Sequence, residues 1–132
     1  MDGATAPVRC VEMLVCMTCR SALPSYSLVP EAEDAPRAGA VLLAALQAAD
    51  VPETIRLVPV ECLSNCTRGC TVALRGAGRW TYIYGNLEAG MVDVLIEGAA
   101  RYAASPDGLV PWRERPEHFR RNCIARIPPL EG

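Results

Sequence analysis

Five cysteines in two clusters are the residues of this chain best suited to chemistry. Cys16 and Cys19 form a Cys-x-x-Cys motif, and Cys62, Cys66 and Cys70 recur at every fourth position further along the chain. Thiolates bind zinc and iron–sulfur clusters, and a short loop between two cysteines can turn both sulfurs toward one metal. A single cysteine is often a small apolar core residue. Five in two clusters instead indicate a soft-metal site.

The residues leave the identity of the metal open. A [2Fe-2S] cluster needs four thiolates, two for each iron, and one pair from each cysteine cluster would supply them. Arg20 and Arg68 lie beside these cysteines, where they would either offset the negative charge of such a cluster or be solvated. Zinc or cobalt could use the same cysteines. A dithiol redox site is a further alternative, but Pro24 and Pro30 interrupt the helix that such a site requires.

Other reactive residues do not form a recognisable catalytic set. Cys10 is expected in the core, Cys123 has no assigned role, and His118, the only histidine, is expected at the surface rather than on a metal. We find no Ser-His-Asp set, phosphate loop or paired carboxylates. The sequence therefore predicts a protein without catalysis of its own.

Composition narrows the class of protein. The chain has 132 residues, of which 51% are apolar, and a net charge of −2. This size predicts a single domain over residues 1–132, and the charge argues against nucleic-acid binding. We find no membrane-spanning run and no signal peptide. We therefore expect a cytoplasmic protein, in which clustered thiols stay reduced and available to metals.

The first half of the chain predicts a strand–helix–strand unit. Residues 8–15 are mostly apolar and β-forming, and they run directly into Cys16. Residues 20–35 read as a loop. A helix is expected to follow from about Pro36 to Asp50, and a second strand over 54–61 leads into Cys62, with Pro59 typical of an edge strand. The predicted buried face of the helix consists of Ala38, Val41, Leu42, Ala45, Leu46 and Ala49.

This unit explains how the two clusters could meet. Strands joined through a helix are normally parallel and make a right-handed crossover. The carboxyl ends of both strands then lie at one edge of the sheet. Since each cysteine cluster directly follows one of these strands, we expect the clusters to lie side by side.

The second half predicts two more strands, a helix and a tail. Residues 71–75 and 80–84 flank the turn Gly76-Ala77-Gly78 and read as an antiparallel hairpin. Asn86 is expected to cap a helix that ends near Ser105.

Residues 1–7 are expected to be flexible. Residues 105–132 form a Pro- and Arg-rich extension without clear periodicity, expected to be irregular and pinned by Trp112 and Phe119. The order β-α-β-β-β-α predicts an α/β domain with a mixed sheet. The buried face of the second helix is expected to comprise Leu87, Met91, Val94, Leu95, Gly98, Ala99 and Tyr102.

The second cysteine cluster and the hairpin after it resemble the thioredoxin-like [2Fe-2S] ferredoxins. The matching residues are Cys62, Cys66 and Gly69, followed by a β-run, Gly78 and the Trp80-Thr81-Tyr82 strand. This resemblance implies a thioredoxin-like fold, a homodimer and a cluster held by Cys16, Cys19, Cys62 and Cys66. Two departures concern the ligands: the family spaces its first pair more widely, and it has proline where this chain has Cys70.

Most of the chain, from about residue 11 to 129, also resembles a family of bacterial metal-binding proteins of unknown function. The resemblance is carried by Cys16-x2-Cys19-Arg20, the Cys62–Cys70 cluster, Tyr82-x-Tyr84-Gly85-x-Leu87 and the tail segments 110–116 and 126–129. Genes of that family often lie near cobalamin-biosynthesis and cobaltochelatase genes. This implies a [2Fe-2S] electron carrier that supplies electrons to cobalt reduction through an unidentified redox partner protein. A zinc- or cobalt-binding structural protein or metallochaperone is the alternative.

Overall fold

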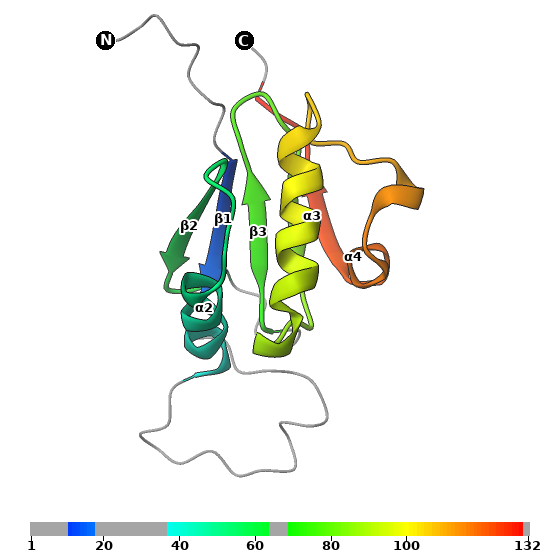
Figure 1. The fold of residues 1–132 in the computed structure, drawn as a ribbon. Helices are drawn as coiled ribbons and strands as arrows, with labels where there is room; N and C mark the ends of the chain where they lie inside the picture. The colour runs from blue at the N-terminus through cyan, green and yellow to red at the C-terminus, as the bar shows by residue number, and fades with distance from the viewer. Residues whose placement is uncertain (1–10, 18–36, 64–68, 131–132) are drawn as a thin grey trace, which may run out of the picture.

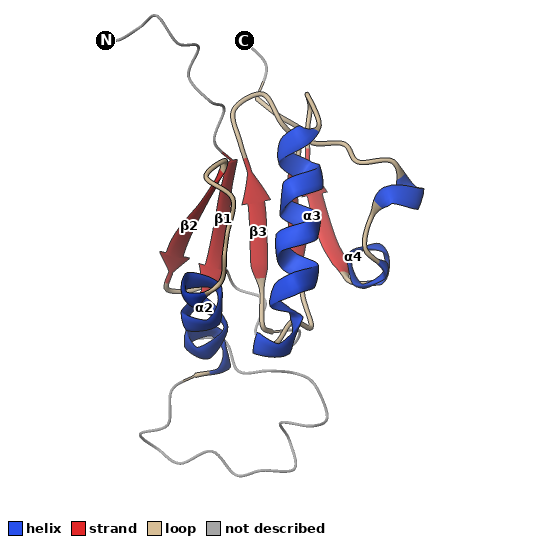
Figure 2. Ribbon diagram, viewed as in Figure 1, coloured by secondary structure: helices blue, strands red, loops and turns tan. Residues whose placement is uncertain are grey.

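The computed structural model describes residues 11–17, 37–63 and 69–130. Within these residues, a five-stranded mixed sheet has the strand order β2-β1-β3-β4-β5. Figure 2 shows α2 and α3 in front of the sheet, so both helices pack on one of its faces. The elements are β1 (Val11–Cys16), α2 (Ala38–Ala48), β2 (Ile55–Val60), β3 (Val72–Arg75), β4 (Thr81–Tyr84), the 3-10 turn η2 (Ala89–Met91), α3 (Val92–Ala104), the 3-10 turn η3 (Trp112–Glu114), α4 (Glu117–Arg121) and β5 (Cys123–Ile127).

The predicted strand–helix–strand unit is confirmed. Strands β1 and β2 are parallel and in register from Val11 opposite Ile55 to Cys16 opposite Val60. Both strands point toward the same end of the sheet in Figure 1, where α2 also begins. Strand β2 lies at the edge, as Pro59 predicted.

The predicted hairpin is also confirmed. The tail was expected to be irregular, but it forms regular secondary structure. Strands β3 and β4 are antiparallel, and β3 pairs with the other side of β1. Strand β5 adds to β4 as a fifth strand, with a register irregularity at Ile83 and Tyr84. The elements of the tail carry weak local patterns, because α4 has a single apolar residue, Phe119, and β5 is interrupted by Arg126.

The buried face of α2 differs from the predicted one. Leu42 and Leu46 are buried as expected, but Val41 is 39% exposed and Leu43 and Gly39 are buried instead. Nearly every position of this helix is apolar, so the 3.6-residue period could not show which face packs on the sheet.

The start of the second helix also differs from the expectation. Asn86 has a positive φ of 55° and does not cap α3, which begins at Val92 after the turn η2. Its side-chain Nδ2 instead donates to Asn122 Oδ1 at 2.8 Å, while Leu87 is fully buried. Asn86 therefore links the β4–η2 connection to the residue before β5. Within α3, Leu95, Gly98, Ala99 and Tyr102 are buried as predicted, whereas Val94, predicted with them, is only half-buried.

One of the two predicted tail anchors is confirmed. Phe119 is 3% exposed, and its ring stacks on Tyr84 with centroids 4.0 Å apart. A Cβ atom at Gly98 would come within 2.1 Å of the Phe119 ring, so α3 can approach this ring only through a glycine. Trp112 is 59% exposed and does not anchor the tail. Arg115 contacts the sheet in its place, because its guanidinium carbon lies 5.6 Å from the centroid of the Tyr82 ring.

A buried arginine from another part of the chain binds the carbonyl groups at the end of helix α3. Arg79, 5% exposed, lies just before β4, and its Nη1 donates to the carbonyl oxygens of Tyr102 and Ser105. These carbonyls belong to the last turn, where a helix lacks partners of its own. Replacing Arg79 by methionine is expected to lower the free energy of unfolding by about 2 kcal/mol, as measured by urea denaturation. The exposed Arg113→Met variant is the control, and an equal effect of both changes would contradict this role.

The Tyr82 hydroxyl is buried and has no hydrogen-bond partner among the described residues. A buried unpaired hydroxyl costs free energy, so Tyr82→Phe is expected to leave the free energy of unfolding unchanged or to raise it by up to about 1 kcal/mol. Tyr102 is the matched comparison, since its hydroxyl donates to Trp80 O at 2.5 Å. Tyr102→Phe is expected to cost about 1 kcal/mol in the same urea titration. A larger loss in the free energy of unfolding for Tyr82→Phe than for Tyr102→Phe would show that the Tyr82 hydroxyl does make a stabilising hydrogen bond.

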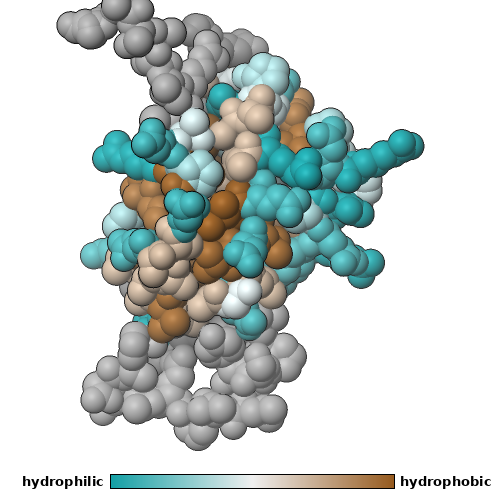
Figure 3. All heavy atoms as spheres, in the orientation of Figure 1, coloured by the Kyte–Doolittle hydropathy of each residue, from teal (hydrophilic) through white to brown (hydrophobic). Residues whose placement is uncertain are grey.

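The helix-bearing face is uneven in polarity. Figure 3 shows apolar residues between α2 and α3, and polar residues over α3 and the C-terminal segment. No helix in the described part of the chain is long and apolar enough to span a bilayer.

Candidate metal centre

Cys16 and Cys62 are delivered to the same edge of the sheet by parallel strands. Cys16 is the last residue of β1 and lies opposite Val60, and Cys62 follows Val60 by two residues. The Cys16 Sγ is 3.8 Å from the carbonyl oxygen of Glu61, the residue that joins β2 to Cys62. The main chain of Cys16 is fixed on its other side, where its N–H donates to Thr71 O at 3.1 Å. The arrangement expected for the first ligand of each cluster is therefore present.

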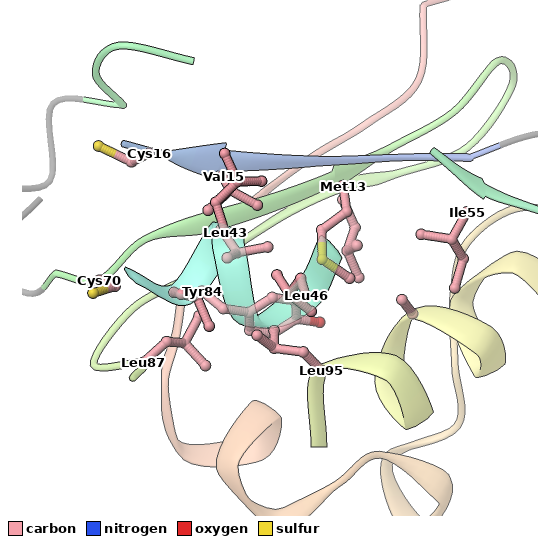
Figure 4. Packing of buried hydrophobic residues seen from close by; sticks show 14 of the residues in the cluster. Met13, Val15, Cys16, Leu43, Leu46, Ile55, Cys70, Tyr84, Leu87 and Leu95 are labelled. Carbon is pink, nitrogen blue, oxygen red and sulfur yellow. The ribbon is translucent and has the colours of Figure 1, made fainter. Parts of the chain in front are cut away.

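Cys70 is a third cysteine at this edge. It directly precedes Thr71 and so lies just before β3, which runs antiparallel to β1. Its N–H donates to Leu87 O at 3.0 Å and its carbonyl oxygen accepts from Leu87 N at 3.2 Å, while the Gly69–Cys70 peptide bond is cis. Figure 4 shows the sulfurs of Cys16 and Cys70 at the same end of the packed core. Backbone bonds thus hold Cys70 in place at the edge that receives the other two cysteines.

The three thiols differ in exposure. Cys16 and Cys70 are 1% and 0% exposed, whereas Cys62 is exposed. Soft thiol donors gathered at one edge suit zinc or an iron–sulfur cluster better than calcium or magnesium, which prefer oxygen.

The described residues alone do not complete a metal site. Within 11–17, 37–63 and 69–130, no three Cys, His, Asp or Glu side chains are grouped closely enough to hold a metal ion. The other predicted ligands, Cys19 and Cys66, lie outside the described residues, as do Arg20 and Arg68. Metal binding by Cys16, Cys19, Cys62 and Cys66 therefore stays a prediction.

Gly39 is a positioning residue that the sequence reasoning missed. It lies in the first turn of α2, and a Cβ atom there would be 1.9 Å from the carbonyl oxygen of Cys16 and 3.2 Å from the carbonyl carbon of Met17. Helix α2 therefore rests directly on the main chain of the predicted ligand. The sequence held one signal for this contact, a glycine inside an otherwise alanine- and leucine-rich helix. Glycine destabilises a helix by about 1 kcal/mol relative to alanine, so its presence indicates close packing at that position.

In the described part of the chain, neither Cys123 nor His118 belongs to a group of three side chains that could hold a metal ion. Cys123 is half-buried in β5 opposite Tyr84, and burial raises the pKa of its thiol, which favours the protonated form over a metal-binding thiolate. His118 is half-buried rather than at the surface as expected, and its Nε2 lies 3.0 Å from Gly85 O. A hydrogen bond at this distance makes Nε2 the protonated nitrogen. Cys10 lies outside the described residues.

The fold is similar to that of two solved structures from Aquifex aeolicus. A thioredoxin-like [2Fe-2S] ferredoxin has a TM-score of 0.54 and 20% identity, over 94% of this chain and 99% of the ferredoxin. A wild-type thioredoxin-like [2Fe-2S] ferredoxin has a TM-score of 0.52 and 15% identity, over 89% and 98% of the two chains. At these identities the likeness establishes the thioredoxin-like ferredoxin fold, as predicted.

Sequence comparison gives the family. No curated protein matches the chain. The predicted link to cobalamin-biosynthesis genes is not confirmed by these comparisons and stays a prediction. Residues 13–129 match the family described as proteins of unknown function (DUF1636), and the chain therefore belongs to that family.

Proposed function

We propose that this protein is a one-electron carrier that holds a [2Fe-2S] cluster and has no catalysis of its own. The observation that carries the proposal is the parallel pairing of β1 and β2, which brings Cys16 and Cys62 to one edge of the sheet. The similarity of the fold to thioredoxin-like [2Fe-2S] ferredoxins supports it.

Cys16, Cys19, Cys62 and Cys66 are the proposed ligands, with Cys70 as the alternative to one of them. When bound, the cluster would supply a site that accepts and returns one electron. The protein would contribute two environments around it. Cys16 is buried in the hydrophobic core, which gives part of the site a low-polarity surrounding, whereas Cys62 is exposed and offers a side on which a partner can approach.

The position of Cys70 supports a second candidate. Cys70 lies at the same edge of the sheet as Cys16 and Cys62 and exceeds the four thiolates that a [2Fe-2S] cluster requires. A spare thiol there would favour zinc or cobalt binding in a structural protein or metallochaperone. In that case Cys70 would be a working ligand, and the metal would be exchanged rather than reduced.

The partners and the pathway are part of the same proposal. An electron carrier needs a redox partner protein, and the family resemblance makes cobalt reduction in corrin synthesis the reaction to examine first. A homodimer is expected from the resemblance to the ferredoxins.

Anaerobic purification separates the two candidates. A [2Fe-2S] protein is expected to be red-brown, to lose its visible absorption on reduction with dithionite and to give an S = 1/2 EPR signal. Iron and acid-labile sulfide are then both found in the sample. A colourless protein that contains zinc but no sulfide would contradict electron transfer and favour the metallochaperone.

A further inference from the structure

A row of charged residues crosses the face of the sheet that points away from α2 and α3, at the end opposite the cysteines. Glu12 in β1 lies directly opposite Arg56 of β2 on one side and directly opposite Arg75 of β3 on the other. Residues paired in this way point to the same face of a sheet. Glu12 follows Val11 and precedes Met13, both of which belong to the core under the helices. Since side chains alternate along a strand, the Arg56–Glu12–Arg75 row lies on the other face.

This row borders a groove of about 500 Å³. The remaining walls come from the β3–β4 turn at Gly76–Gly78, from Arg79 and Thr81, and from the end of the chain that follows β5. The groove therefore touches all five strands or their connections at this end of the sheet. A volume of this size is within the range of about 300–1,000 Å³ typical of small-molecule sites.

The groove is positively charged on a negatively charged protein. Three arginines and one glutamate line it, a net charge of +2, whereas the whole chain carries −2. Arg75 is oriented by its Nε, which donates to Glu12 Oε1 at 2.7 Å, so its terminal nitrogens stay available to a ligand. Arginine presents such nitrogens in a planar array that fits carboxylate and phosphate groups.

The opposite wall of the groove is apolar. Ile127 and Leu130 line it together with the two prolines between them, and these two side chains are 49% and 98% exposed. Exposed apolar groups beside arginines suit a ligand that carries both an apolar group and an anionic group.

We infer that this groove binds a small organic anion, with a carboxylate or phosphate against Arg56 and Arg75 and an apolar body against Ile127 and Leu130. The site is separate from the cysteines, because Glu12 and Cys16 are four residues apart along β1, about 13 Å. The groove volume of about 500 Å³ lies within the range of about 300–1,000 Å³ for small-molecule sites, so a small molecule is the proposed occupant.

The probe for the test is 1-naphthoate, compared with the uncharged 1-naphthalenemethanol, on the full-length protein. Naphthoate is expected to shift the amide NMR signals of Gly76 and Gly78 and to bind about tenfold more tightly than the alcohol, because only the acid can engage the arginines. Equal affinities for the two compounds, or shifts confined to other parts of the chain, would overturn the inference. No binding of naphthoate would also overturn it and leave an acidic protein segment as the occupant to examine.

Matched charge variants complete the test. The double variant Arg56→Gln/Arg75→Gln is expected to weaken naphthoate binding by about tenfold or more, whereas Arg113→Gln/Arg121→Gln, which removes the same charge from η3 and α4, is expected to keep it. If the first double variant fails to fold, Arg56→Gln alone leaves the Glu12–Arg75 pair intact and is expected to show part of the loss. Equal losses in the two double variants would show a general charge effect and no site.

Discussion

Replacing Cys62 by serine is expected to abolish the visible absorption and the EPR signal of the anaerobically purified protein. Serine is a poor ligand for iron in a thiolate-bound cluster, and three remaining ligands do not hold two irons. Cys62 is the cleanest position for this test because it is exposed, so the change leaves no hydroxyl buried in the core. Cys16→Ser is expected to lose the cluster as well, but there the serine also enters a site that is 1% exposed.

Cys123→Ser is the control, since this cysteine lies in β5 and is not a proposed ligand. It is expected to keep the colour and the iron content. The remaining cysteines decide the ligand set: Cys66→Ser and Cys19→Ser are expected to lose the cluster, and Cys70→Ser to keep it. Loss of the cluster in Cys70→Ser together with its retention in Cys19→Ser would reverse the assignment and make Cys70 the fourth ligand.

Gly39→Ala is expected to lower the free energy of unfolding by about 3 kcal/mol, as measured by urea denaturation. The added methyl group would be 1.9 Å from the Cys16 carbonyl oxygen, which is main chain and cannot turn away as a flexible side chain would. Helix α2 must therefore move off β1. In the absence of this contact, alanine would stabilise the helix by about 1 kcal/mol, so the sign of the effect is itself informative.

Gly90→Ala provides the matched control. Gly90 is exposed in η2, and a Cβ atom there would meet only the Glu88 side chain, at 3.3 Å. Its effect is expected to stay within about 0.5 kcal/mol. A Gly39→Ala variant as stable as the parent protein would show that α2 does not rest on Cys16.

The parts of the fold that could be predicted are those with strong local patterns. The apolar strand before Cys16 and the helix ended by Pro52 required a parallel crossover, and this placed Cys16 and Cys62 at one edge before the structure was known. The turn at Gly76–Gly78 predicted the hairpin in the same way. Backbone geometry and chain connectivity decide these features, and both can be read from residue types.

Features that depend on contacts between distant residues could not be predicted. The packed face of α2 is set by Gly39 meeting Cys16, which no periodicity reveals in a helix where almost every residue is apolar. Strand β5 follows two contacts that hold the tail against β4: the Phe119 ring stacks on Tyr84, and the Arg115 guanidinium lies over the Tyr82 ring. Its own sequence, with Arg126 between two apolar residues and prolines after it, carries little β signal. The burial of Cys70 likewise depends on its backbone pairing with Leu87.

Pro59 has a consequence for how copies of this protein can associate. An edge strand offers unpaired N–H and carbonyl groups to which another chain can add a strand, and this is a common route to aggregation. Strand β2 is such an edge, and proline removes one of its donors. The β2 edge is thereby protected from continuing into a second sheet. A dimer of this protein would then join through the β5 edge, through a face of the sheet or through its helices, leaving β2 as the outer limit of each copy.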